Sequence, residues 1–362
     1  WLTKILLDAG ADVTGYSLEQ QSNQNLYSKT GIERYKNYHL ITGDIRNLDL
    51  LRLAFETAQP EIVFHLAAQP IVRDSYRDPV YTYSTNVMGT VNILECVRIH
   101  ARLKKPVRSF LNVTTDKVYK NNEWEYGYRE IDPLDGHDPY SNSKSCSELV
   151  THSYKASFFS AIEKEAHKTG KPLVAISTVR AGNVIGGGDF AADRIIPDSV
   201  RALQTAMENG LNKAFINVRN SYAVRPYQHV LEAVFSYLMI AKAQYENEGF
   251  ADCYNIGPDD VDCVTTGKLV TLFCDKWNKS VGYPNVYWQA SEEKSAPHEA
   301  DLLKLDCSKV KSVFGWHPKW HIEKAIEEVV KFSEVWMQNR TVEDYRAIER
   351  EMEREINEYV TS

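Results

Sequence analysis

The sequence predicts an α/β protein built on a doubly wound parallel sheet, with a smaller α/β lobe that closes over the carboxyl ends of the strands. Two observations support this prediction. Short strands alternate with helical stretches over the first half of the chain, which is the order of a parallel sheet with crossover helices. The strand segments are near-continuous apolar runs, as expected where helices cover both faces of a sheet.

Length and composition exclude several classes of protein. The chain has 362 residues, of which 43% are hydrophobic and 25% charged, and a net charge of -7. A nucleic-acid binder would show a basic surplus, and no apolar run approaches the roughly 20 residues that span a bilayer. The visible start is neither a signal nor a transit peptide. The six cysteines form no C-x-x-C pair, so we expect reduced thiols, a cytoplasmic protein and no metal site.

In the first third of the chain, each predicted element has a recognisable boundary. The segment WLTKILLDAG indicates the end of a helix closed by Gly10, and the strands ADVTGYS and YHLITGDI follow. Asn47 is the expected cap of the helix NLDLLRLAFETAQ, and EIVFHLAA is the third strand. A long helical stretch is predicted from about Val80 to Ala101, before the strand RSFLNVTT.

An irregular segment then extends to His137. Asp138 and Pro139 are typical of the cap and first turn of a long helix. The strand PLVAISTVR and the glycine-rich loop AGNVIGGGD come next.

The second half of the chain predicts the smaller lobe. The short strands predicted in this half are AFINV, DCYNI and NVYWQA, and helices are expected at Ile195–Asn209, Gln228–Glu246, Thr266–Asn278 and Ile322–Gln338. The last stretch, TVEDYRAIEREMEREINEYV, indicates a charged, solvated helix to which we assign no chemistry. We expect a first domain at 1–182, to which about 227–255 returns, a lobe made of 183–226 and 256–340, and a charged helix at 341–362.

The segment PYSNSK places Tyr140 and Lys144 on one helix face, because residues four apart are neighbours there. A free phenol has a pKa of about 10, and a nearby ammonium favours its phenolate form. Such a pair could take a proton from an alcohol while the carbon gives hydride to a nicotinamide. The spacing alone is a weak signal, since it occurs by chance on many helices.

Polar or small residues at several strand ends strengthen that signal. Thr115 could bind the same substrate oxygen, and Asp44 could accept a hydrogen bond from an adenine amino group. HLAAQ ends another strand where a dinucleotide would lie, although plain strand packing would also explain it. Asp116 and Lys117 follow Thr115, and an isolated Asp-Lys pair is usually a solvated turn.

The chain resembles a known family. GDIR, HLAAQP, TYSTNVMGT, TTDKVY, DPYSNSK, VRAGNVIGGGD, VRPYQHV and FGWHPKW occur in the order found in extended short-chain dehydrogenases that act on sugar nucleotides. The resemblance extends from Trp1 to about Trp336, and more narrowly it is to CDP-glucose 4,6-dehydratases. It implies a Rossmann-type NAD-binding domain, tightly bound NAD, and CDP-glucose or a related sugar nucleotide as substrate. It also implies at least a homodimer, formed by the helices around Val80–Ala101 and after Asp138.

The resemblance implies roles for the strand-end residues. Tyr140 takes the proton of the 4-hydroxyl, Asp116 acts as the acid for the departing C6 hydroxyl, and Thr115 and Lys144 complete the catalytic set. Lys117 can take the C5 proton only in its neutral form. In the alternative, charged Lys117 stabilises the enolate and another group such as Glu123 is the base.

Further residues are assigned by position in the family motifs. Arg225 resembles the main diphosphate clamp, for which its fixed charge and forked donors suit it. The other implied substrate ligands are Asn183, Arg194 and His298. The implied cofactor ligands are Asp44, Ile45, Leu66, Ala67, Ala68, Gln69, Thr85, Tyr140 and Lys144.

The sequence departs from the family at two points. The family opens with a strand and a G-x-x-G-x-x-G turn that cradles the pyrophosphate, whereas this sequence begins at Trp1 and its GGGD at Gly186 comes too late. We expect a preceding segment to supply both. The strand ADVTGYS does not end in an acid, which leaves Glu19 as the candidate ribose ligand. No arginine follows that strand, so nothing favours NADP.

Two other functions remain open at this point. A 4-epimerase or reductase would share the Tyr140–Lys144 pair, but it needs no acid for a C6 hydroxyl. A non-catalytic NAD-binding scaffold would fit the absent glycine turn but not the intact pair. GDP, dTDP or UDP could replace CDP.

Overall fold

The structure is a computed structural model. It describes residues 1–19, 25–103, 106–160, 173–281, 283–291, 300–339 and 346–362.

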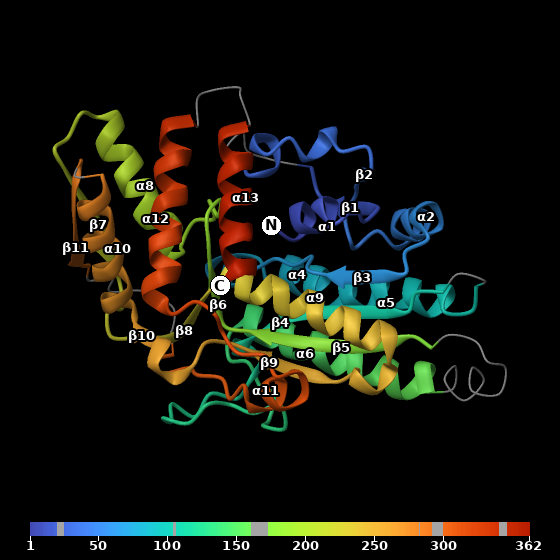
Figure 1. Ribbon diagram of the computed structural model, residues 1–362. Coiled ribbons are helices and arrows are strands. Elements are labelled where there is room, and N and C mark those ends of the chain that lie inside the picture. The colour runs from blue at the N-terminus through green and yellow to red at the C-terminus, as the bar shows by residue number, and fades with distance from the viewer. Residues whose placement is uncertain (20–24, 104–105, 161–172, 282, 292–299, 340–345) are drawn as a thin grey trace.

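A parallel sheet of four strands, one of them from the second half of the chain, lies between helices (Figure 1). Its order is β3 (Ile62–His65), β4 (Ser109–Thr115), β5 (Ala175–Ala181) and β9 (Cys253–Ile256). All seven residues of β5 are buried, which confirms that helices cover both faces. In the register of β4 and β5, Thr115 lies opposite Ala181, so these two strands end at the same edge.

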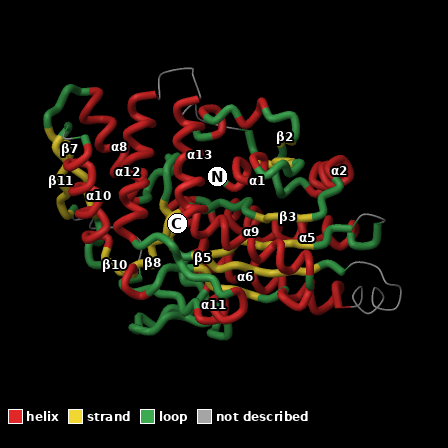
Figure 2. Tube along the Cα trace, viewed as in Figure 1, coloured by secondary structure: helices red, strands yellow, loops and turns green. Residues whose placement is uncertain are grey.

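Two further strands form a separate parallel pair. The pair consists of β1 (Val13–Ser17) and β2 (Tyr38–Thr42). Figure 2 shows helices on either side of the strands, as the doubly wound prediction requires, and the fold class is confirmed.

Helix boundaries in this half follow local capping chemistry. Helix α2 (Leu48–Ala58) begins where Asn47 Oδ1 accepts the Leu50 N–H at 3.1 Å. Helix α6 (Pro139–Tyr154) begins where Asp138 Oδ1 accepts the Ser141 N–H at 3.0 Å. Both predicted caps are therefore confirmed. Helix α1 (Leu2–Asp8) ends just before Gly10, which has a φ of 82°.

The helical stretch predicted from about Val80 to Ala101 is confirmed, and it contains a π-helical turn that the sequence did not predict. The segment forms α4 (Pro79–Tyr83), a π-helical turn η3 (Ser84–Met88) and α5 (Gly89–His100). Within the π turn, the Asn86 side chain accepts the Gln69 N–H at 2.8 Å and donates to the Gln69 carbonyl at 3.1 Å. The π turn therefore directs the Asn86 side chain towards the loop after β3. The spacing of apolar residues in the sequence does not reveal such a turn.

The smaller lobe contains two small sheets. One is β10-β8-β6, in which β6 and β8 are parallel and β10 and β8 antiparallel; the other is the parallel pair β11-β7. The strands are β6 (Asn183–Ile185), β7 (Lys213–Val218), β8 (Val224–His229), β10 (Cys263–Thr265) and β11 (Asn285–Ala290). The main helices are α8 (Ile195–Glu208), α10 (Thr266–Ser280) and α12 (Ile322–Asn339).

Two expectations about this lobe need correction. The segment AGNVIGGGD is not only a loop, because its residues Asn183–Ile185 form β6. The helix expected from Gln228 begins at Val230, as α9 (Val230–Glu246), because β8 extends through His229. Strand β8 has five of its six residues buried and lies between two partner strands, so its character comes from pairing and not from local alternation.

The C-terminal helix differs most from its prediction. Helix α13 (Arg346–Thr361) buries Ile348, Met352, Glu355 and Tyr359 along one face. Their spacing of four, three and four residues makes an amphipathic stripe, so the expectation of a solvated helix is wrong. Figure 1 shows α13 between α12 and the N-terminal helix α1.

The remaining elements are short. They are α3 (Val72–Arg77), α11 (Ser308–Phe314), η1 (Tyr27–Lys29), η2 (Ile32–Arg34), η4 (Asp116–Val118), η5 (Lys155–Phe159), η6 (Glu248–Phe250) and η7 (Asp260–Asp262).

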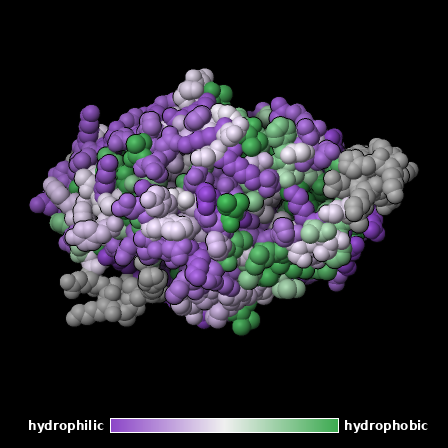
Figure 3. All heavy atoms as spheres, turned by 90° about the horizontal axis from the view of Figure 1, so that it is seen from below, coloured by the Kyte–Doolittle hydropathy of each residue, from purple (hydrophilic) through white to green (hydrophobic). Residues whose placement is uncertain are grey.

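Figure 3 shows, from below, a largely hydrophilic face with separate apolar patches. Over the residues that the structure describes, no helix is long and apolar enough to cross a membrane. In the same part of the chain, no cluster of side chains could hold a metal ion. All six cysteines are unpaired.

Candidate active site

The edge of the sheet where β4 ends holds three consecutive polar residues. Strand β4 ends at Thr115, and the 3-10 turn η4 begins at Asp116. Thr115 Oγ1 donates to Asp116 Oδ1 at 2.9 Å and accepts the Lys117 N–H at 3.4 Å. This tight turn presents all three residues at the edge where doubly wound sheets bind ligands.

Asp116 is a buried carboxyl group, and only one of its two oxygens forms a hydrogen bond within the described residues. The residue is 1% exposed, and its Oδ2 has no hydrogen-bond partner among the described residues. Burial raises the pKa of Asp116, while the charges of Lys117 and Arg225 and the hydrogen bond from Thr115 oppose that rise. The environment therefore favours the neutral acid, which can donate a proton.

Helix α6 brings Tyr140 and Lys144 to the same edge. Burial raises the pKa of Tyr140 to about 12, while a hydrogen bond with Thr115 lowers it. The ammonium of Lys144 is buried and donates to the Val113 carbonyl at 3.0 Å. Burial lowers the pKa of Lys144 to about 8, and the charge of Glu148 opposes this. The structure thus brings Thr115, Asp116 and Tyr140 together, with Lys144 anchored to β4 beside them.

The loop after β3 provides a surface that suits a dinucleotide. Leu66 is exposed, and Ala67 and Ala68 are partly exposed, so apolar groups are open to a ligand. Gln69 is buried and donates from Nε2 to Thr82 Oγ1 at 2.8 Å. The buried Thr85 Oγ1 has no hydrogen-bond partner in the described part of the chain. These residues fit a bound nicotinamide dinucleotide.

The residues after β2 form the other end of this surface. Asp44 forms an ion pair with Arg46, with Oδ2 2.6 Å from Nη2, and this contact lowers its pKa. Asp44 is therefore an anion that is already held in place. Ile45 is buried and packs so closely on Gly89 that a Cβ there would lie 2.7 Å from Ile45 Cγ2. Glu19 is exposed, two residues beyond β1.

The candidate substrate ligands lie on the lobe. Arg225 is buried on β8 and donates from Nη1 to the Val224 carbonyl at 2.9 Å. Asn183 lies on β6, which pairs with β8. Arg194 precedes α8 and pairs with Asp189 at 3.2 Å. His298 lies outside the described residues.

Glu123 is held in a different contact. Its exposed carboxylate accepts the backbone N–H groups of Asp301 and Leu302 at 3.1 and 2.8 Å. Its φ of 52° shows that the backbone turns sharply there. A base that must also cap another segment is less available than Lys117 for proton transfer.

Two charged groups were not predicted from the sequence, Asp193 and Glu148. Asp193 pairs with Arg219 of the lobe at 2.8 Å and with Arg73 of α3 at 3.7 Å. No motif signals this contact, because the three residues are far apart in the chain. Glu148 follows Lys144 by one helical turn and pairs with Arg180 at 3.0 Å. Its position was visible as a further step on the Tyr140–Lys144 face.

Sequence comparison assigns the chain to a group of enzymes. The model of the GDP-mannose 4,6 dehydratase family matches residues 1–329. The CDP-glucose 4,6-dehydratase of Salmonella typhimurium is 40% identical over 363 aligned residues, which cover 100% of this chain and 93% of that protein. The CDP-paratose 2-epimerase of Salmonella typhi is 25% identical and covers 81% of this chain and 83% of its own length.

Solved structures share the fold. A dTDP-glucose 4,6-dehydratase from Bacillus anthracis in complex with NAD has a TM-score of 0.70 and 20% identity, covering 94% of this chain and 93% of that one. A UDP-glucuronic acid 4-epimerase from Bacillus cereus, in complex with UDP-glucuronic acid and NAD, has a TM-score of 0.72 and 19% identity, covering 92% and 94%. At this identity the likeness concerns the fold alone.

Proposed function

Because this chain belongs to the GDP-mannose 4,6 dehydratase family, we propose that it is an NAD-dependent hydro-lyase that converts CDP-D-glucose to CDP-4-keto-6-deoxy-D-glucose. The reaction comprises oxidation at C4, loss of water across C5 and C6, and return of the hydride to C6. The single observation that supports dehydration over simple epimerisation is Asp116, a buried acid with a raised pKa beside Thr115. The C6 hydroxyl needs such a proton donor to leave.

The residues of the site divide the proton transfers among them. Tyr140 takes the proton of the 4-hydroxyl, and Thr115 hydrogen-bonds the same oxygen. Asp116 then protonates the departing C6 hydroxyl. NAD, when bound, supplies a hydride acceptor and a positive charge that favours the Tyr140 phenolate.

We assign the C5 proton to Lys117. It adjoins Asp116 in η4, so the base and the acid of the elimination come from one turn. Glu123 is the alternative base, but its carboxylate accepts the amides of Asp301 and Leu302. Lys117 must be neutral to take this proton, because an ammonium group has no acceptor.

The proposed cofactor site is the surface around the ends of β2 and β3, with Glu19 as the ribose ligand. Its residues are Asp44, Ile45, Leu66, Ala67, Ala68, Gln69, Thr85, Tyr140 and Lys144. Support comes from the exposed apolar loop after β3 and from the unpartnered hydroxyl of Thr85 among the described residues.

The proposed sugar-nucleotide site lies on the lobe formed by 183–226 and 256–340. Arg225 clamps the diphosphate, and Asn183, Arg194 and His298 are further ligands. The adjacent strands β6 and β8 support this assignment, because they place Asn183 and Arg225 on one small sheet. The first domain is then 1–182, with about 227–255 added to it.

We also propose a homodimer that forms through α4, α5 and α6. Val80, Met88 and Leu149 are 77%, 51% and 55% exposed on these helices and the π turn between them. The six unpaired cysteines fit a reducing compartment, so we place the protein in the cytoplasm. Its product would enter the synthesis of deoxysugars for O-antigen or another surface polysaccharide.

The deciding experiment offers the protein CDP-, dTDP-, GDP- and UDP-glucose and follows the 4-keto-6-deoxy product. We expect turnover with CDP-glucose. With CDP-glucose deuterated at C4, the deuterium should appear at C6 because the hydride stays within the molecule. Loss of deuterium to solvent, or a C4 epimer without keto sugar, would contradict the proposal.

A variant separates the elimination from the oxidation. Asp116→Asn cannot protonate the departing hydroxyl, so the reduced cofactor and 4-keto-glucose should accumulate on the enzyme. Absorbance of the reduced nicotinamide measures this directly. Equal slowing of oxidation and elimination would remove the acid role from Asp116.

A further inference from the structure

Glu148 is a buried carboxylate that the proposed mechanism does not use. It lies on α6, four residues after Lys144 and eight after Tyr140, so all three share one face of the helix. Its side chain is 4% exposed. A buried charge at this distance from a catalytic lysine calls for a physical explanation, because burying it is costly unless it is paired.

Three donors surround the Glu148 carboxylate. Its Oε1 accepts from Thr114 Oγ1 at 2.5 Å. Its Oε2 accepts from Thr178 Oγ1 at 2.7 Å and from Arg180 Nη2 at 3.0 Å. Since every partner donates, the carboxylate acts only as an acceptor, as its ionised form requires. Glu148 thereby joins α6 to the ends of both β4 and β5.

The contact to β4 falls within the catalytic stretch of that strand. Thr114 lies between Val113, whose carbonyl accepts the Lys144 ammonium, and Thr115, which hydrogen-bonds Asp116. A shift of Thr114 would move both neighbours. Glu148 therefore holds the strand that anchors Lys144 and presents Thr115.

The charges around Lys144 leave Glu148 as its counter-charge. From β3, His65 is neutral because burial lowers its pKa to about 3. At the end of β4, burial raises the pKa of Asp116, which favours its neutral form. Burial raises the pKa of Tyr140 to about 12, so its phenol adds no negative charge while the cofactor is absent. Glu148 opposes the effect of burial on Lys144.

Arg180 of β5 is the remaining charge, and its guanidinium is shared among several acceptors. It donates to the phenol oxygen of Tyr119 at 2.8 Å and to the Glu130 carbonyl at 3.0 Å, as well as to Glu148. These contacts divide the donors of Arg180 among three acceptors, of which Glu148 is one.

We propose that Glu148 is a positioning residue of the reaction: it fixes the end of β4 against α6 and keeps Lys144 in its ammonium form. This proposal rests on the proposed function, in which that ammonium favours the Tyr140 phenolate. A purely structural ion pair between Glu148 and Arg180 is the competing explanation. The two explanations differ in what removal of the negative charge does to the titration of Lys144.

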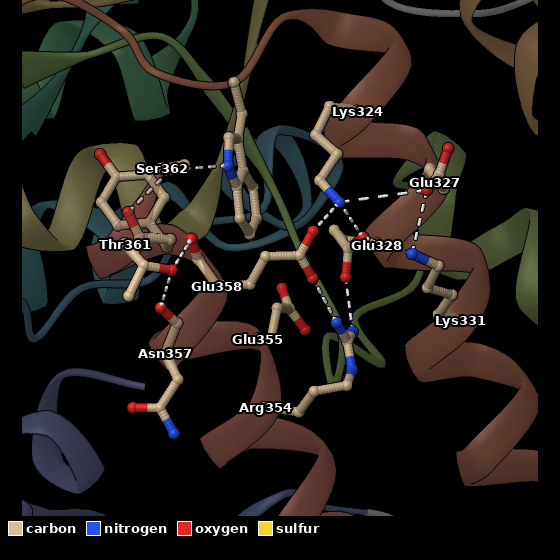
Figure 4. Close-up of polar contacts among 12 residues, drawn as sticks. Lys324, Glu327, Glu328, Lys331, Arg354, Glu355, Asn357, Glu358, Thr361 and Ser362 are labelled. Atoms are coloured by element: carbon tan, nitrogen blue, oxygen red, sulfur yellow. Dashed lines mark hydrogen bonds and ion pairs between the residues drawn. The ribbon is translucent and has the colours of Figure 1, made fainter.

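The test compares Glu148→Gln with a matched control, Glu328→Gln. Glu328 on α12 is likewise buried and has three donors, which are the charged groups of Lys324, Lys331 and Arg354 (Figure 4). The pH profile of C4 oxidation is measured from reduced nicotinamide in a single turnover. In Glu148→Gln we expect the alkaline limb to move down by about one pH unit, because loss of a nearby opposite charge lowers the pKa of Lys144. Glu328→Gln should leave the profile in place.

A second measurement does not depend on turnover. Lysine labelled with 13C at Cε reports the titration of Lys144, and Lys144→Met assigns its signal. A lower titration midpoint in Glu148→Gln, restored in Glu148→Asp, supports the proposal. An unchanged midpoint with unchanged pH limbs would overturn it and leave a structural pair. If wild type oxidises no sugar nucleotide, the proposed function fails, while the 13C titration still decides the role of Glu148.

Discussion

Helices α6 and α13 both bury glutamates, but the groups around those glutamates differ. On α6, Glu148 follows Tyr140 and Lys144 along the face that meets the strand ends. On α13, Glu355 Oε1 lies 2.7 Å from His229 Nε2, with neither side chain exposed. Glu353 of α13 pairs at 2.8 Å with Lys4 of α1. The first helix gathers its charges at one site, and the second distributes them among α1, β8 and α12.

The difference shows what pairing does to a buried carboxyl group. Asp116 is buried without a full set of donors, so its pKa rises and it is suited to give up a proton. Burial also tends to raise the pKa of Glu328, but hydrogen bonds from Lys324, Lys331 and Arg354 outweigh it and hold the pKa at about 2. The pKa values of Asp116 and Glu328 are thus shifted in opposite directions, because charged donors surround only Glu328.

The largest expected effect is the loss of C4 oxidation when Tyr140 on α6 is replaced. Tyr140→Phe removes the proton-transfer group, so C4 oxidation should fall by about 100- to 10,000-fold while NAD stays bound and the melting temperature is unchanged. Stopped-flow absorbance and a thermal melt measure the two. Turnover near the wild-type rate would take Tyr140 out of the mechanism.

The matching change on α13 is Glu355→Ala. It leaves the buried His229 imidazole without its partner and opens a cavity, so the free energy of unfolding should fall by about 3–5 kcal/mol. The rate of C4 oxidation per folded molecule should stay within a factor of two or so. Urea unfolding measures the free energy of unfolding. Titration of the active sites with NAD gives the concentration of folded enzyme by which the rate is divided. A large loss of rate without loss of stability would place α13 in the chemistry.

Acid should weaken the α12–α13 cluster. The folded pKa of Glu328 lies below its unfolded value, so its stabilisation is complete above the unfolded pKa and is lost as pH falls towards about 2. The shift corresponds to about 3 kcal/mol. Unfolding curves between neutral pH and pH 2 should show that Glu328→Gln loses less stability over this range than wild type does. Parallel pH dependences would refute the assignment.

Lys117→Met sharpens the assignment of acid and base at the end of β4. The variant should still oxidise C4, but exchange of the C5 proton with solvent should fall by about 100-fold. Proton NMR in deuterated water follows that exchange. Undiminished exchange would exclude Lys117 as the base and direct attention to Glu123.

The smallest effect is expected at the rim of the same cluster. Glu358 of α13 pairs with Lys324 and with Arg354, but its side chain is 37% exposed (Figure 4). Glu358→Gln should therefore change the free energy of unfolding by less than about 1 kcal/mol, with an effect that disappears in high salt. A loss as large as that of Glu355→Ala would mean that exposure does not separate these two carboxylates.

Local signals in the sequence were sufficient to predict the sheet, the helix caps and helix α6. Continuous apolar runs predicted β4 and β5, because a strand covered on both faces has no polar alternation. Asn47 and Asp138 predicted helix starts, because a cap depends on the next three residues only. Tyr140 and Lys144 could be paired because helical geometry fixes residues four apart. Each of these features is decided within one turn or one strand.

Tertiary structure decided the remaining features, since they depend on partners far away in the chain. Strand β8 exists because β6 and β10 pair with it on either side. The π turn forms where Asn86 meets Gln69, and Glu355 is buried because His229 lies opposite it. The raised pKa of Asp116 comes from burial, which no neighbour in sequence sets. Contacts between distant segments determine how deeply a carboxyl group is buried and how many donors it has. These two properties set the difference in pKa between Asp116 and Glu328.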